Sequence, residues 1–233
     1  MATSSIGRRE FLGRLGRGAV GLAGAAGLMN LATSCSDDDD TSAPLNFVVI
    51  LVDDMGWTDL ACFGSGYYET PNIDALATQG MKFTNAYAAC TVCSPTRAAL
   101  MTGKYPARLH LTDWIAGHTR TDRKTLRPPF LQQLPLAEET IAEALEVDGY
   151  AAAHIGKWHL GTEPYYPDQQ GFDVNIAGTD KGQPHNGYFV PYNIPTLTEG
   201  PAGEYLTDRM GDEAANWIDV HRDDRFFLYL SHF

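Results

Sequence analysis

The chain has 233 residues, of which 44% are hydrophobic and 20% are charged, and these proportions are those of an ordinary globular protein. The net charge of −12 argues against nucleic acid as a partner, although a local cluster of cations could still bind an anion. About 190 residues follow the first 45, which is enough for one sizeable hydrophobic core.

The first 35 residues are predicted to be an export signal. Arg8 to Leu12 form a twin-arginine motif, and Ala19 to Leu31 are too few and too weakly hydrophobic for a good membrane span. The segment Leu31-Ala-Thr-Ser-Cys35 is an imperfect lipobox, its leucine one place early, with Cys35 as candidate lipid acceptor. Residues 36–45 are predicted to be an acidic, flexible tether. We therefore expect the export machinery to deliver an extracytoplasmic, lipid-anchored protein to the periplasm or cell surface.

A continuous apolar, β-branched run at residues 46–52 predicts a strand buried on both faces of a parallel sheet. It leads directly into Asp53 and Asp54. Two adjacent carboxylates on a turn are suitable ligands for Ca²⁺ or Mg²⁺, and the alternative is a cap or turn without a metal. Residues 70–80 then predict a short helix, and residues 81–86 a short strand.

The next helix is predicted to begin at Cys93. Pro95 favours the first turn, the following Ala-Ala-Leu-Met run favours helix, and Gly103 stops it. Cys93 would then lie at a helix N-terminus, where free N–H groups favour an anion such as a sulfate monoester. Arg97, one turn further on, can point to the same place. The alternative is a buried structural cysteine.

The chain continues with a polar segment, a helix and a strand, and two basic residues follow that strand. The segment 114–134 is rich in Arg, His, Thr and Pro, and is either the rim of a pocket or a solvated loop. Residues 135–147 predict an amphipathic helix, and residues 150–155 a strand. Lys157 and His159 lie on the same side if that strand extends through them. The alternative is a loop lysine and a packed histidine.

The chain closes with a predicted helix at residues 204–220 and a strand at 226–230. Alternating strands and helices predict an α/β fold with a doubly wound, mostly parallel sheet. Ligands gather at the carboxyl ends of such strands, so the two charged clusters should meet on one edge. Because the sequence stops on a core strand, we expect it to be the N-terminal part of a longer protein.

Three motifs together resemble the signatures of type I sulfatases. They are the runs Cys93-Ser-Pro-Thr-Arg-Ala-Ala-Leu-Met-Thr-Gly103, Asp53-Asp-Met-Gly56 and Gly156-Lys-Trp-His-Leu-Gly161. Further segments look like bacterial exported members of the arylsulfatase A type, namely Gly171–Asn175, Gly187–Tyr192 and Glu204–Arg209. The resemblance covers residues 46–233 and implies the N-terminal portion of a catalytic domain with an alkaline-phosphatase-like fold.

The resemblance also implies a mechanism. A maturase oxidises Cys93 to formylglycine, whose hydrate attacks the sulfur of a sulfated carbohydrate or aryl sulfate. Asp53 and Asp54 ligate Ca²⁺ together with the residue derived from Cys93. Arg97 holds the hydrate, Lys157 binds sulfate oxygens, and His159 accepts a proton from the formylglycine hydroxyl.

The chain also departs from the family. A later histidine in a Pro-His context, an Asp-Asn calcium pair and a later lysine are expected in complete members and do not occur here. We therefore expect the 233 residues alone to be inactive and to bind calcium weakly. Whether Cys62 and Cys90 pair is open. The alternatives are a phosphate or phosphonate ester hydrolase of the same superfamily, and a non-catalytic exported lipoprotein that binds carbohydrate.

Overall fold

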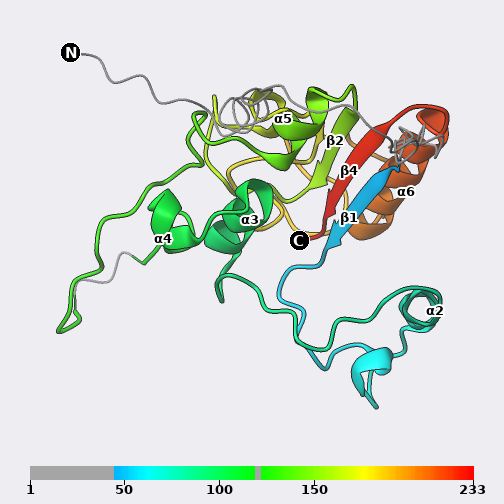
Figure 1. Cartoon of the computed structure of the whole chain (residues 1–233), viewed down its shortest axis with the longest axis horizontal. Helices are drawn as coiled ribbons and strands as arrows, with labels where there is room; N and C mark the ends of the chain where they lie inside the picture. Colours follow the sequence, from blue (N-terminus) through cyan, green and yellow to red (C-terminus); the bar gives the residue numbers. More distant parts are fainter. Residues whose placement is uncertain (1–44, 119–121) are drawn as a thin grey trace, which may run out of the picture. The chain divides into compact units, whose positions relative to one another are not determined.

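The computed structural model describes residues 45–118 and 122–233, so the predicted signal peptide and nearly all of the tether lie outside the described residues. Its sheet has four parallel strands in the order β1-β4-β2-β3. Figure 1 shows β4 between β1 and β2. The strands are β1 (Phe47–Leu51), β2 (Ala151–Gly156), β3 (Val174–Ile176) and β4 (Phe226–Ser231). The predicted α/β parallel sheet is confirmed.

Helices connect these strands. The α-helices are α2 (Pro71–Gln79), α3 (Cys93–Thr102), α4 (Pro106–Leu109), α5 (Ile141–Glu146) and α6 (Leu206–Val220), and the 3₁₀ helices are η1 (Ala61–Phe63) and η2 (Pro167–Gln169). Across the part of the chain that the structure describes, none of these helices is both long enough and apolar enough to cross a membrane.

The sheet is covered on both faces, as a doubly wound fold requires. One face carries Ala152, Phe227 and Tyr229, which pack with buried residues of α3 and α5. The other face carries Ala153 and Leu228, together with their neighbours on the same strands, and packs against Leu206, Met210 and Ala214 of α6. This alternation along β2 and β4 is the two-residue period of a strand buried on both sides.

Three local predictions are wrong. The run at 46–52 is a strand, but Phe47, Val48 and Ile50 are 40–57% exposed, because β1 is an edge strand that, among the described residues, pairs only with β4. Residues 81–86 form no strand. The helix predicted from 135 begins at Ile141, because Thr140 and Glu143 form a capping box that fixes its start.

Candidate active site

An ion-pair cluster lies at the carboxyl edge of the sheet. Asp53 follows β1, Lys157 follows β2, and Arg97 comes from the second turn of α3. The Arg97 Nη2 atom lies 3.0 Å from Asp53 Oδ1, and the Lys157 ammonium group contacts the other carboxylate oxygen. Arg97 and Lys157 are only 1% and 2% exposed. The predicted convergence of two sequence-distant clusters is therefore present, with one carboxylate held between two buried cations.

The pKa of Asp53 lies below its ordinary value. Burial by itself raises that pKa, but the hydrogen bond from Lys157 and the charges of Arg97 and Lys157 outweigh it. Asp53 is therefore ionised at neutral pH, and the two cations exceed its charge by one. Such an excess favours an anionic ligand beside the cluster.

Sequence reasoning missed one member of this cluster, Ser231, the last residue of β4. Its hydroxyl donates a hydrogen bond to the carbonyl oxygen of Lys157 at 2.9 Å and accepts one from Arg97 Nη1. The same Nη1 atom donates to the Lys157 carbonyl at 2.7 Å. The sequence could have indicated Ser231, because a parallel strand was predicted just before it and the carboxyl end of that strand must reach the same edge of the sheet.

His159 is buried beside this cluster, at 3% exposure. Strand β2 ends at Gly156 and His159 has a left-handed φ of 59°, so the strand does not extend through Lys157 and His159 as the same-side prediction assumed. Burial, together with the charges of Lys157 and Arg97, lowers the pKa of His159 to about 4, against a hydrogen bond to Ile115 and the charge of Asp53, which raise it. The imidazole is therefore neutral near pH 7.

The tautomer of His159 follows from its contacts. The Nε2 atom contacts the carbonyl oxygen of Ile115, which can only accept, so Nε2 carries the proton of the neutral ring. Nδ1 then holds the free lone pair, and it has no hydrogen-bond partner among the described residues. A neutral imidazole with a free lone pair is suited to accept a proton.

Cys93 is the first residue of α3, as predicted, and its side chain is half-buried. Gly103 ends the helix in the left-handed conformation that its role as a stop requires. Cys62, Cys90 and Cys93 are all free thiols in the structure. The first turn of α3 also contacts the segment after α4, because Ser94 Oγ accepts a hydrogen bond from the Ile115 amide at 3.1 Å.

Asp54 lies next to Asp53, is exposed, and has a left-handed φ of 55°. The two carboxylates offer hard oxygen ligands of the kind that calcium prefers, so the pair fits this cation in chemical type. Within residues 45–118 and 122–233, no group of three or more His, Cys, Asp and Glu side chains is placed to hold a metal ion. Asp53 and Asp54 thus supply only some of the oxygen ligands that a calcium ion needs.

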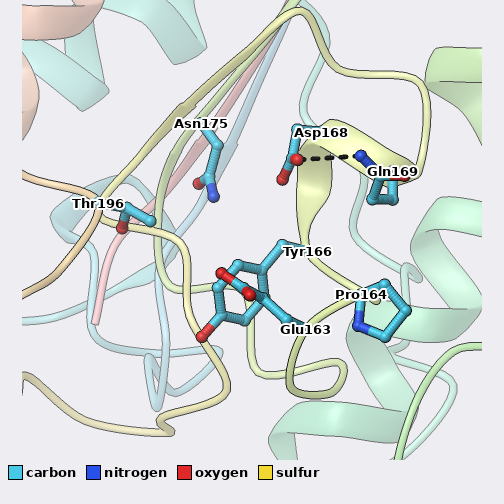
Figure 2. A pocket seen from close by; sticks show the side chains of 7 residues that line it. All are labelled: Glu163, Pro164, Tyr166, Asp168, Gln169, Asn175 and Thr196. Carbon is cyan, nitrogen blue, oxygen red and sulfur yellow. Dashed lines mark hydrogen bonds between the residues drawn. The ribbon is translucent and has the colours of Figure 1, made fainter.

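A cavity of about 630 Å³ lies elsewhere. Figure 2 shows its lining. The side chains are mostly acids and amides, namely Glu163, Pro164, Tyr166, Asp168, Gln169, Asn175 and Thr196. None of them belongs to the cluster or to the segment 114–134, which we expected either to rim a pocket or to form a solvated loop. That segment touches the cluster region through Ile115.

A comparison with protein families decides what kind of chain carries this cluster. The family model for sulfatases matches residues 45–232. The chain belongs to the sulfatase family. All of the cluster residues lie inside the matched range, so the resemblance carried by the three sequence motifs is confirmed.

Known sulfatases are similar to this chain along part of their length. N-acetylgalactosamine-6-sulfatase of Sus scrofa is 40% identical over 165 residues, which cover 67% of this chain and 30% of that protein. Arylsulfatase A of Homo sapiens is 41% identical over 132 residues, covering 55% of this chain and 24% of that protein. The chain therefore spans less than a third of the length of these two relatives.

Solved sulfatase structures also have the same fold. The crystal structure of Ps i-CgsB is 30% identical, with a TM-score of 0.63, and covers 80% of this chain and 44% of that one. The PsFucS1 sulfatase from Pseudoalteromonas sp. is 28% identical, with a TM-score of 0.60, over 80% of this chain and 43% of that one. The alkaline-phosphatase-like fold expected of this sulfatase-family chain is confirmed for the part it contains.

Proposed function

We propose that this protein is a sulfuric ester hydrolase that cleaves sulfate monoesters. The observation that carries the proposal is the pair of buried cations, Arg97 and Lys157, joined through Asp53 at the carboxyl edge of a sulfatase-family sheet. A sulfate monoester is an anion, and its oxygens are natural acceptors for a guanidinium and an ammonium group.

Cys93 is the proposed source of the nucleophile, after conversion to formylglycine by a maturase. The hydrate of this aldehyde would supply the hydroxyl that attacks sulfur. Arg97 lies one turn along α3 from Cys93 and would orient that hydroxyl, while Lys157 would stabilise charge that develops on the sulfate oxygens. His159, with its free Nδ1 lone pair, would accept a proton from the second hydroxyl when sulfate is released.

Asp53 and Asp54 are the proposed ligands of Ca²⁺, together with the residue derived from Cys93. The cation would supply further positive charge beside the sulfate group. In the structure Asp53 already binds two cationic side chains, so its carboxylate is ionised and held in place before any metal arrives.

The proposed substrate class is a sulfated carbohydrate or an aryl sulfate. Relatives support it, since two of them are named N-acetylgalactosamine-6-sulfatase and arylsulfatase A. Ps i-CgsB, at 30% identity, was solved in complex with k-i-k-neocarrahexaose.

The central test is the chemical state of residue 93. Peptide mass spectrometry of protein produced together with a maturase should show loss of the thiol and reactivity of an aldehyde. In the longer protein of which this chain is expected to be part, Cys93→Ala should abolish hydrolysis of a generic aryl sulfate in the presence of calcium. Cys62→Ala, the matched control, removes another half-buried thiol and should leave turnover intact. An active preparation in which Cys93 is wholly unmodified would refute the nucleophile.

The same assay separates the alternatives. A matched pair of substrates, an aryl sulfate and the corresponding aryl phosphate, is offered under identical conditions. Faster hydrolysis of the phosphate ester would favour a phosphoesterase of the same superfamily. No hydrolysis of either by the longer protein, with sulfated polysaccharide still bound, would favour a binding lipoprotein.

We also propose that the protein is exported by the twin-arginine route and anchored through Cys35. These residues lie outside the described part of the chain, and the proposal is supported by the motifs alone. Replacing Arg8 and Arg9 together by lysine should leave the protein in the cytoplasm, as fractionation would detect. Export of the double variant at the normal level would exclude this route, and lipid labelling that survives Cys35→Ala would exclude the anchor.

A further inference from the structure

Ser231 contacts the guanidinium of Arg97 and the backbone of Lys157, and carries no charge itself. Its hydroxyl is completely buried and is shared between two partners, the carbonyl oxygen of Lys157 and the Nη1 atom of Arg97. Arg97 Nη1 also donates to the Lys157 carbonyl. These three groups therefore form a closed ring of hydrogen bonds.

The ring fixes the Arg97 guanidinium at one end while Asp53 fixes it at the other. Nη2 donates to Asp53 Oδ1 at 3.0 Å, and Nη1 is held by Ser231 and by the Lys157 carbonyl. A planar group bound at both ends cannot rotate about either contact. Without the Ser231 hydroxyl, one of these anchors would be weakened.

Ser231 holds Lys157 through the backbone of that lysine. Its amide donates to the Ser231 carbonyl oxygen at 2.8 Å, and its ammonium group contacts Asp53. The close approach depends on Gly156, the strand partner of Ser231, because a Cβ atom there would lie 1.9 Å from the Ser231 carbonyl oxygen. The backbone and the hydroxyl of Ser231 thus place both cations relative to one sheet edge.

We propose that Ser231 is a positioning residue that sets the orientation of the Arg97 guanidinium, and the position of the Lys157 backbone, relative to the sulfate group. The inference rests on the proposed function, since it assigns the two cations to one anionic ligand. Small displacements of positioned groups have large effects on rate, so the expected effect of losing the hydroxyl is on turnover as well as on stability.

The test compares Ser231→Ala with Thr140→Ala in the longer protein of which this chain is expected to be part, with Cys93 converted. Thr140 is the matched control, because its hydroxyl is also buried and donates to a carbonyl, that of Gln170, at 2.8 Å. Ser231→Ala should lower kcat/KM toward an aryl sulfate by about 10- to 100-fold, whereas Thr140→Ala should change it less than about twofold. Ser231→Thr, which keeps the hydroxyl, should recover most of the loss.

Urea denaturation of each variant separates a loss of folded protein from a loss of orientation. If Ser231→Ala and Thr140→Ala lower kcat/KM equally, after correction for the folded fraction, the positioning role is refuted. A Ser231→Ala variant with unchanged kcat/KM refutes it as well.

A second measurement needs no activity. Hydrogen exchange of the Arg97 guanidinium protons, followed by NMR without substrate, should be about tenfold or more faster in Ser231→Ala than in the wild type or in Thr140→Ala. Equal exchange would overturn the proposal. If the longer wild-type protein hydrolyses no sulfate ester, the proposed function fails, while the exchange rates still decide whether Ser231 holds the guanidinium.

Discussion

His154 lies in the middle of β2 and should make the stability of this protein fall steeply in mild acid. Its ring is fully buried and packs edge-on against Trp158 at 5.2 Å and Tyr229 at 5.4 Å, measured between ring centroids. Neither ring nitrogen has a hydrogen-bond partner among the described residues. Burial, helped by the charge of Arg97, lowers the pKa of His154 to about 3, against smaller raising effects of the nearby Asn175 side chain and Lys157 backbone.

The sign of the effect follows from the two states. The folded protein keeps His154 neutral down to about pH 3, whereas the unfolded chain protonates it below about pH 6.5. The stabilisation is therefore fully present above pH 6.5 and is lost as the pH falls toward 3. At 1.4 kcal/mol per pH unit, the loss is about 3 kcal/mol at pH 4.5 and approaches about 5 kcal/mol near pH 3.

His154→Phe isolates this contribution, because phenylalanine keeps an aromatic ring beside Trp158 and Tyr229 and cannot be protonated. Urea denaturation at pH 7.5 and pH 4.5 gives the free energy of unfolding of each protein. The wild type should lose about 3 kcal/mol more than the variant between these pH values. His118→Phe, which removes an exposed ring, is the matched control. Parallel pH dependence in the wild type and His154→Phe would refute the reasoning.

Two further substitutions test the ion-pair cluster and the sheet edge by urea denaturation. Asp53→Asn leaves two buried cations without their carboxylate and should cost about 3–5 kcal/mol, while the exposed Asp54→Asn should cost much less; equal costs would contradict the cluster. Gly156→Ala should cost more than about 3 kcal/mol, because φ is +108° and the new Cβ would meet Ser231. The control Gly211→Ala, with open space in α6, should be neutral or stabilising by up to about 1 kcal/mol, and a comparable loss there would contradict the steric argument.

The parts of the fold that the sequence predicted are those governed by local chemistry. The helix at Cys93 begins at a preorganised proline turn and ends at Gly103, because glycine takes the left-handed conformation without strain. Alternating strands and helices predicted the parallel sheet, and its geometry then brought Asp53 and Lys157 to one edge. These inferences need no knowledge of distant contacts.

The parts that the sequence did not predict depend on neighbours in space. A continuous apolar run at 46–52 indicates burial on both faces, but the pairing order places β1 at the edge of the described sheet. Ser231 lies just past the strand predicted at 226–230, and its proposed role follows only from the contacts with Arg97 and Lys157 in space. The capping box at Thr140 could have been recognised, since Thr-x-x-Glu is a helix start signal. The amphipathic pattern from residue 135 instead led to a start that is too early.

The cluster also explains how a chain with a net charge of −12 can be suited to an anion. Exposed acidic residues act over roughly the Debye length, about 8 Å at physiological ionic strength, and are screened by salt beyond it. Arg97 and Lys157 are almost completely buried, so water and salt screen them far less. At an effective dielectric constant of about 20, a unit charge 4 Å away interacts with an anion by about 4 kcal/mol. With Asp53 neutralising one of the two cations, the remaining buried charge outweighs the weak global field, and the site favours an anion locally.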